Sequence, residues 1–308
     1  MDGVVKNMYK LGNHSSAFGI AAVDRAYARL QRPPQVMLNT IMTSFGIIAG
    51  NGVYPLLVAR SARKAGIQRL VAVAFQNETD PKLAELVDEV EWIRVGQLAK
   101  MVACFRKRGI GEAVMAGQIN PKHLFDLRPD VKALLLLARL KTRNAESIFG
   151  AIAGELGKSG VTLLPATTFL EDCLARPGLI AGPKLNRREE EDITYGFGIA
   201  KEMSRLDIGQ TVIVKKGTVL AVEAFEGTNE TIKRGGALGR RDAIMIKVSK
   251  PNQDFRFDVP VIGPRTLETA RDAQLRAIAV EAGKTLVLEK EAVLERAAAY
   301  RISVVGKT

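Results

Sequence analysis

Short apolar runs alternate with glycine-containing turns and helical segments along most of this chain, and that alternation limits the fold more than any other feature. The first copy comprises a strand at 45–49, a turn at 50–52, a helix through Val58 to Ala65 and a strand at 70–75. Pro55 suits the first helical turn, where its missing N–H costs nothing. Strands that alternate with helices build parallel sheets, so the sequence predicts an α/β fold that opens with a Rossmann-like layer.

The turn at Gly50 and Gly52 lacks the full pattern of a dinucleotide site. Such a site needs a third glycine where Pro55 stands, and an acid at the end of the second strand, where Gln76 and Asn77 precede Glu78. NAD is therefore disfavoured, although a Rossmann-type redox enzyme stays as one alternative. Contact of Gly50 and Gly52 with a phosphate or a sugar remains open.

The following elements complete a first domain, expected at 43–176. We expect strands at 91–95, 113–115 and 161–164 and helices at 98–108, 133–138 and 147–158. The run of leucines at 133–138 indicates a buried helix with a basic end. The segment from Pro177 to Pro183, with two glycines, marks the expected boundary.

A second, mixed α/β domain is expected at 184–308. A charge run at 187–192 indicates the solvated start of a helix that extends through Leu206. We expect strands at 211–214, 219–224, 244–248, 254–259, 277–280, 285–288 and 302–305, with helices at 266–273 and 290–299. The strand order cannot be derived from the sequence.

Polar and apolar residues alternate strictly from Asp254 to Asp258. In a strand this places Asp254, Arg256 and Asp258 on one face, and Pro260 ends the strand. At ~3.3 Å per residue, about 13 Å would separate the α-carbons of Asp254 and Asp258. Both could not then bind one Mg²⁺, so only one would serve a reaction centre.

The stretch from Val219 to Glu230 indicates a strand that ends near a glycine and leads into a helix. Thr228 is the expected N-cap, and the helix is expected to end near Gly235 and Gly236. Free N–H groups at such a helix start suit a phosphate. Glu223 and Glu226 lie beside this turn, although taken alone the stretch could be an ordinary turn with two solvated glutamates.

Several motifs together resemble the LpxI type of UDP-2,3-diacylglucosamine diphosphatase. They are Asp207-Ile-Gly-Gln210, Leu220-Ala-Val-Glu-Ala224, Glu226-Gly-Thr228, Lys250-Pro251 and Asp258-Val-Pro-Val-Ile-Gly263, and the resemblance extends from Thr43 to the C-terminus. It implies Mg²⁺-dependent cleavage of the pyrophosphate of a lipid-linked nucleotide sugar in lipid A synthesis, giving UMP and 2,3-diacylglucosamine 1-phosphate (lipid X).

The resemblance also implies roles for individual residues. Asp258 is the expected catalytic residue, as a metal ligand or as the general base that prepares water. Glu223 and Glu226 are further expected metal ligands. The expected substrate contacts are Gly50, Gly52, Ala116, Gly117, Gln210, Glu226, Gly227, Thr228 and Lys250.

The chain departs from the family pattern at three turns, one of which has Arg143-Asn-Ala-Glu146 in place of the family's Gly-Asp-Asp. Asn229 stands where the family has aspartate, which raises the alternative of altered metal affinity or substrate. Gln118 stands where asparagine is usual, in a turn that contains Ala116 and Gly117. A non-catalytic nucleotide-sugar binding or regulatory protein is therefore a further alternative.

Composition sets the outer bounds on function. The 308 residues are 47% hydrophobic, enough for a substantial core, and two cysteines and two histidines are too few for a zinc cluster or a disulfide framework. The formal charge of +12 suits anionic partners, while scattered basic residues and 6% aromatics disfavour nucleic acid. We expect a cytoplasmic protein, peripheral on the inner membrane and docked on its anionic surface, and leave a homodimer open.

The first 41 residues carry no part of the resemblance. They contain the turn-rich segments 12–16 and 32–34 and end just before Met42, which is a candidate initiator. Asp24 and Arg25 interrupt the apolar run at 17–28, which makes it a poor signal peptide. We expect a disordered extension, or residues upstream of the true start.

Overall fold

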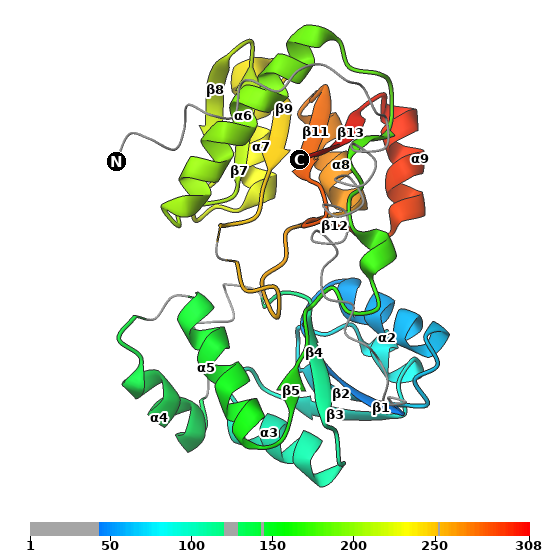
Figure 1. Cartoon of the computed structure of the whole chain (residues 1–308), viewed down its shortest axis with the longest axis vertical. Coiled ribbons are helices and arrows are strands. Elements are labelled where there is room, and N and C mark those ends of the chain that lie inside the picture. Colours follow the sequence, from blue (N-terminus) through cyan, green and yellow to red (C-terminus); the bar gives the residue numbers. More distant parts are fainter. Residues whose placement is uncertain (1–42, 120–128, 143–144, 252) are drawn as a thin grey trace, which may run out of the picture. The chain divides into compact units, whose positions relative to one another are not determined.

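The computed structural model describes residues 43–119, 129–142, 145–251 and 253–308 (Figure 1). The expected extension at 1–41 and the candidate initiator Met42 lie outside the described residues. In the described part, the chain forms an α/β fold with one five-stranded and one six-stranded sheet, as the alternating pattern predicts.

The first sheet is entirely parallel and has the order β3-β2-β1-β4-β5. Its strands are β1 (Ser44–Ala49), β2 (Arg69–Phe75), β3 (Glu89–Ile93), β4 (Glu112–Ala116) and β5 (Thr162–Leu163). Its helices are α2 (Tyr54–Lys64), α3 (Leu98–Lys107), α4 (Val131–Arg139) and α5 (Ala145–Lys158), with a 3-10 turn, η1 (Pro81–Glu85), after β2. The chain reverses its direction of strand addition between β1 and β4, which is the switch point of a doubly wound sheet.

The second sheet is mixed, in the order β6-β13-β11-β9-β7-β8. Its strands are β6 (Gly178–Ala181), β7 (Thr211–Lys215), β8 (Thr218–Val222), β9 (Ile244–Lys247), β11 (Ala277–Glu281) and β13 (Ser303–Lys307). The pairings make β8, β9, β11 and β13 run in one direction and β6 and β7 in the other. A separate parallel pair joins β10 (Val261–Ile262) to β12 (Leu286–Val287).

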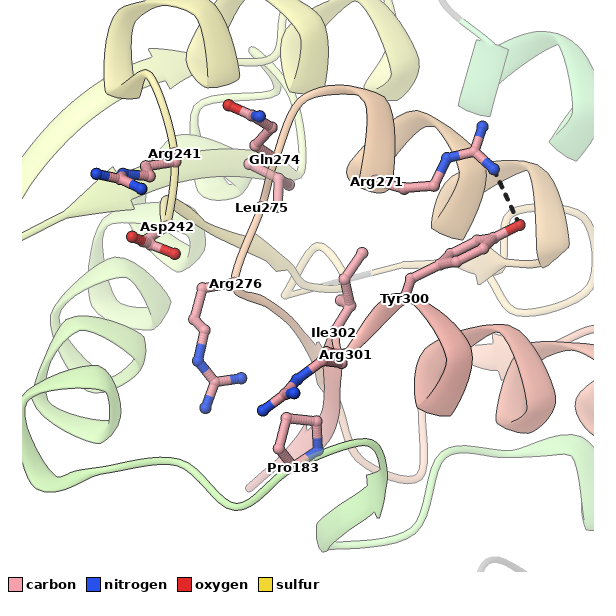
Figure 2. A pocket seen from close by; sticks show the side chains of 10 residues that line it. All are labelled: Pro183, Arg241, Asp242, Arg271, Gln274, Leu275, Arg276, Tyr300, Arg301 and Ile302. Carbon is pink, nitrogen blue, oxygen red and sulfur yellow. Dashed lines mark hydrogen bonds between the residues drawn. The ribbon is translucent and has the colours of Figure 1, made fainter.

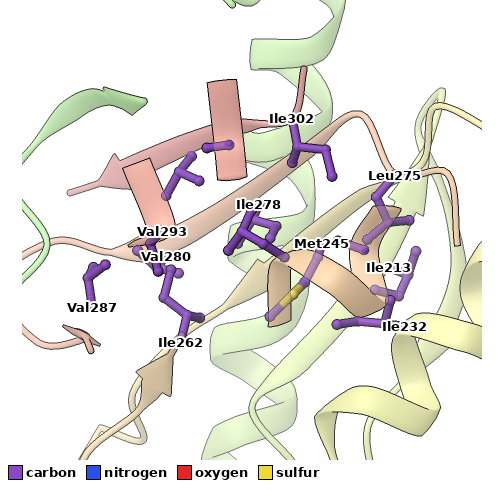
Figure 3. Packing of buried hydrophobic residues seen from close by; sticks show 14 of the residues in the cluster. Ile213, Ile232, Met245, Ile262, Leu275, Ile278, Val280, Val287, Val293 and Ile302 are labelled. Atoms are coloured by element: carbon purple, nitrogen blue, oxygen red, sulfur yellow. The ribbon is translucent and has the colours of Figure 1, made fainter. Parts of the chain in front are cut away.

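Alternation along the strands assigns the two faces of the second sheet. Val212 and Val214 pack with α6 (Arg187–Arg205), whereas Ile213 between them faces the opposite core. That opposite core contains residues of α7 (Thr228–Gly239), α8 (Pro264–Asp272) and α9 (Lys290–Tyr300), and Figure 3 shows it around Met245 and Ile278. The sheet is therefore buried on both faces.

A tight hairpin joins β7 to β8. Its two turn residues, Lys216 and Gly217, have positive φ angles of 49° and 71°. Asp192 of α6 accepts hydrogen bonds from both of their backbone N–H groups, each at 2.7 Å. The hairpin is thereby fixed to α6.

The strand expected at 254–259 is wrong, because this segment is a turn. The backbone N–H groups of Phe257 and Asp258 both donate to the carbonyl of Asp254, at 3.2 and 3.0 Å. The Asp254 carboxylate also accepts from the backbone of Arg256 and pairs with its guanidinium group. Local hydrogen bonds of this kind compete with strand pairing. The separation of about 13 Å expected between Asp254 and Asp258 assumed a strand, so it no longer applies.

Three smaller expectations also need correction. The segment expected as a boundary contains β6, so the second sheet begins at Gly178, upstream of residue 184. Helix α7 continues past Gly235, which packs against Ile213, and ends at Gly239. The helix expected to be buried at 133–138 is α4, and its Leu134 is 53% exposed.

Candidate functional site

The carboxyl edge of the second sheet gathers most of the expected site residues. Since β8, β9 and β11 run in the same direction, Glu223, Lys247 and Glu281 all reach this edge. Gln210 enters the same edge because β7, which it precedes, is antiparallel to them. Ligands of open α/β sheets bind outside the carboxyl ends of the strands, so this edge is the candidate site.

A hydrogen-bonded chain of Glu223, Thr228 and Lys247 forms the inner part of the site. The Thr228 hydroxyl donates to Glu223 Oε1 at 2.8 Å and accepts from Lys247 Nζ at 2.7 Å. Both charged residues are buried. Glu223 Oε2 has no hydrogen-bond partner among the described residues, so it retains the capacity to bind a ligand.

Gly227, rather than Thr228, is the N-cap of α7. Its φ of 82° favours glycine, and Thr228 becomes the first helical residue. That shift of one position frees the Thr228 side chain from capping and directs it to Glu223. The position expected for the start of this helix is confirmed, but the expectation that Thr228 is its N-cap is wrong.

Asp258 lies within electrostatic range of the same ammonium group as Glu223. Burial lowers the pKa of Lys247, and the negative charges of Glu223 and Asp258 act against that shift. Burial raises the pKa of Asp258 and outweighs the positive charge of Lys250. Lys250 pairs with Asp207 through its Nζ. Two carboxylates thus lie close to one buried lysine.

Lys247 is the residue of this site that the sequence analysis missed. It ends a strand whose other residues, Ile244 to Ile246, are apolar and buried. A charged residue at the last position of a buried strand was the available signal. A buried lysine is expensive unless it is paired, so its position here points to function.

Glu226 is engaged by protein donors on both oxygens. Oε1 accepts from Arg234 and Thr231, and Oε2 accepts from the backbone of Ala224 at 3.0 Å. The hydrogen bond from Arg234 is the largest cause that lowers the pKa of Glu226, to about 2. Its carboxylate therefore stabilises the start of α7 in this structure.

Gln210 presents a second unused acceptor at the edge. Its backbone carbonyl accepts from Val248 at 2.9 Å, while its side-chain Oε1 is buried and has no hydrogen-bond partner within the described ranges. Because a buried amide oxygen normally has a donor, Gln210 suits contact with a ligand.

Glu281 fixes the backbone that leads to Lys250. Its Oε2 accepts from the backbone N–H and the hydroxyl of Ser249, both at 2.8 Å. Lys201 and Lys284 form ion pairs with the same carboxylate. Burial raises the pKa of Glu281, but these donors outweigh it and bring the pKa to about 2. The segment before Lys250 is thus held by an ionised, 6%-exposed carboxylate.

The first sheet brings Gly50, Ala116 and Gly117 together at its own carboxyl edge. Gly50 N donates to Ala116 O at 2.8 Å, and Asn51 exchanges backbone hydrogen bonds with Gln118. A Cβ on Gly50 would lie 2.6 Å from Gln118 O, and one on Gly117 would lie 2.7 Å from Asn51 O. These glycines are required by close backbone approach. Gly52 has a φ of +93° and open space around its Cα, so its surroundings leave room for a ligand.

A cavity of about 480 Å³ lies at the opposite, amino-terminal edge of the second sheet (Figure 2). Arg276 there pairs with Glu189 and donates to Ser303, while Arg271 pairs with Asp272 and lies 4.8 Å from the Tyr300 ring centroid. The cavity contains none of the expected site residues. Its arginines serve mainly to join the elements around it.

Comparison with known proteins gives matches over most of the chain. The family model described as the LpxI N-terminal domain matches residues 44–173, and the one described as the LpxI C-terminal domain matches residues 176–305. UDP-2,3-diacylglucosamine pyrophosphatase LpxI of Caulobacter vibrioides is 29% identical over 276 residues, covering 86% of this chain and 98% of that protein.

Solved structures give weaker matches. The biotin carboxylase subunit of pyruvate carboxylase is 14% identical and covers 59% of this chain and 35% of its own, with a TM-score of 0.25. The biotin carboxylase domain of 2-oxoglutarate carboxylase from Hydrogenobacter thermophilus is 14% identical over 57% of this chain and 35% of its own, also with a TM-score of 0.25. Superpositions this poor carry no argument about function.

Proposed function

The chain belongs to the LpxI family, and we propose that it hydrolyses the pyrophosphate of UDP-2,3-diacylglucosamine in lipid A synthesis, releasing UMP and 2,3-diacylglucosamine 1-phosphate. The observation that carries the proposal is that the family match spans both sheets, while Asp258 and Glu223 lie within electrostatic range of the buried Lys247 at the carboxyl edge of the second sheet. A pyrophosphate is an anion, and this edge supplies cations for it.

The residues at this edge suit the separate tasks of the reaction. Lys247 and Lys250 offer positive charge to the phosphate oxygens, and the N–H groups at the start of α7 add to it. Asp258 is proposed to orient and deprotonate the attacking water, a role in which a carboxylate of raised pKa is more effective. Gln210 and Gly227 are proposed to contact the substrate.

We extend the proposal to Mg²⁺, held by Glu223 and, as the alternative to its role as general base, by Asp258. The unpaired, buried Oε2 of Glu223 fits a metal ligand. The described residues contain no group of three or more His, Cys, Asp or Glu side chains placed to hold a metal, so the pyrophosphate and water would supply the remaining oxygens, as is usual for Mg²⁺. Bound Mg²⁺ would polarise the phosphoryl oxygens. Glu226, the third expected metal ligand, could join them only after its carboxylate is released from the ion pair with Arg234.

The proposal includes a cytoplasmic location and reversible docking on the anionic inner membrane. Among the described residues, no helix has the length and apolar character needed to cross a bilayer. A formal charge of +12 and a diacylated substrate favour docking at the surface. Docking of this kind should weaken at high salt because salt screens the charges.

The test is release of UMP from UDP-2,3-diacylglucosamine, with Mg²⁺ and after its removal by EDTA. We expect release by the native protein and loss of release in Asp258→Ala, with unchanged circular dichroism. Tight substrate binding without UMP release would favour the non-catalytic nucleotide-sugar binding protein. Saturable binding of NAD in place of UMP release would favour the redox enzyme.

A further inference from the structure

Helix α4 carries an apolar ridge that faces solvent. Val131, Leu134 and Leu135 are 71%, 53% and 55% exposed, and Ala138 is also exposed. Positions i, i+3, i+4 and i+7 share one side of a helix, so these four residues form a continuous strip along α4. We call this strip the α4 ridge. Burial of the α4 ridge against another apolar surface would be favourable, which indicates a binding surface.

The α4 ridge is presented by a firmly anchored helix. The Asp130 carboxylate accepts from the backbone of Ala133 at 2.9 Å, which caps α4, and from the backbone of Ala99 at 2.7 Å, near the start of α3. Ala133 packs into the core of the first sheet, with Leu136 against it. One side of α4 (Figure 1) is thus packed against the core of the first sheet, whereas the four ridge residues are exposed.

The C-terminal end of α4 is basic. Arg139 and Lys141 are exposed at the end of the helix and have no ion pair among the described residues. Helix α4 contains no acid, and the two oxygens of its N-cap, Asp130, are occupied by backbone N–H groups. Lys132 is paired with Glu155. An apolar strip with basic residues at its end is typical of a helix that lies in a membrane interface.

We propose that α4 is the element that docks this protein on an anionic lipid bilayer, with the α4 ridge among the lipid headgroups and Arg139 and Lys141 against lipid phosphates. The proposal rests on the proposed function, because a diacylated substrate resides in a bilayer. A nine-residue helix is about 14 Å long and lies flat in the headgroup region.

A second copy of the chain is a poorer occupant. Stable protein interfaces bury roughly 800 Å² on each partner, and one short ridge offers far less. The basic end of α4 would also repel the same end of a second copy, whereas it attracts anionic lipid.

The experiment compares the native chain with the double variant Leu134→Glu/Leu135→Glu in sedimentation with vesicles of phosphatidylglycerol and phosphatidylcholine. Each leucine is expected to contribute about tenfold to partitioning, so binding should fall by at least that factor. The matched control is Leu238→Glu, which alters a 63%-exposed leucine of α7 and should leave binding unchanged. Arg139→Gln and Lys141→Gln should each weaken binding about fivefold, on anionic vesicles alone.

An activity arm separates docking from substrate contact. UMP release from detergent-dispersed substrate should be unchanged in the double variant, while release from substrate in vesicles should fall. Equal sedimentation of native and variant chains, or equal loss of activity in detergent, would overturn the proposal. So would a native dimer that the double variant turns into monomers. Absence of UMP release from the native chain would refute the proposed function alone, since sedimentation tests docking independently.

Discussion

The ammonium group of Lys247 donates a hydrogen bond to the hydroxyl of Thr228 at 2.7 Å. That hydroxyl donates a hydrogen bond to Glu223 Oε1 at 2.8 Å, so a buried cation and a buried anion are joined through one threonine. The pairing reduces the cost of burying both charges. It also leaves Glu223 Oε2 unused beside them.

Lys247→Met should lower kcat/KM for UMP release by at least ~10²-fold, since the site loses a cation in a water-poor position. Methionine has a similar length but leaves the buried Glu223 carboxylate without its nearby cation, so the melting temperature should also fall. Steady-state kinetics and thermal melting check both statements. Lys215→Met is the matched control, because Lys215 donates to backbone carbonyls of Gly239 and Arg241 at the other edge. It should cost stability and spare kcat.

Asp258→Ala should abolish hydrolysis, with a loss of at least ~10²-fold, while Asp254→Ala should retain measurable turnover. Asp254 supports the turn but pairs with Arg256, so its carboxylate is committed to the structure. Single-turnover assays of both variants are the measurement. The assignment of the reaction centre fails if Asp254→Ala is the more damaging change.

Glu281→Gln should flatten the acid side of the stability curve. The folded pKa of about 2 lies below the ordinary 4.5, so ionisation of Glu281 stabilises the fold above pH 4.5. This contribution, about 3 kcal/mol, is lost as the pH falls from about 4.5 to about 2. Urea unfolding across that window should show a shallower decline in the variant. Glu295→Gln, on an exposed residue of α9, should decline as the native chain does.

Gly50→Ala and Gly117→Ala should each destabilise the first sheet by about 1–3 kcal/mol, because the new methyl group would meet backbone atoms that cannot move aside. Gly52→Ala is the control for positive φ without crowding and should cost about 1 kcal/mol. Chemical unfolding gives the three values. Equal losses at all three positions would argue against close backbone approach.

Asn229→Asp should lower the Mg²⁺ concentration that gives half-maximal UMP release, if the family's aspartate belongs to the metal site. The residue lies in the first turn of α7, where a negative charge is also favourable for the helix. A magnesium titration of native and variant chains measures the difference. An unchanged half-maximal concentration would mean that position 229 serves the helix alone.

Most helices and strands could be predicted because their apolar runs are bounded by glycine, proline or charge, as around β1 and β9, whereas the short strands β6 and β10 were not expected. The turn from Asp254 to Asp258 could not be predicted from the sequence. Its alternation imitates a strand, while the Asp254 side chain satisfies local N–H groups and closes a turn. Period alone does not reveal such local competition.

The candidate site was predicted in part. Glu223 and Gln210 come together because strand direction places them at one edge, which their motifs did not require. Asp258 comes near Lys247 on the turn segment that follows β9. Lys247 was not predicted as a site residue because its role depends on neighbours distant in sequence, Thr228 and Glu223 among them. For α4, a run of leucines indicated burial, but burial depends on which side of the helix has a partner.

The hairpin between β7 and β8 is a suitable attachment site for a label or a surface tether. Its turn at Lys216 and Gly217 lies at the edge of the sheet opposite to Glu223 and Lys247. A fluorophore or a surface tether attached at Lys216 would therefore leave the candidate site facing solution. Immobilised through this turn, the protein could be presented to substrate vesicles in one known orientation.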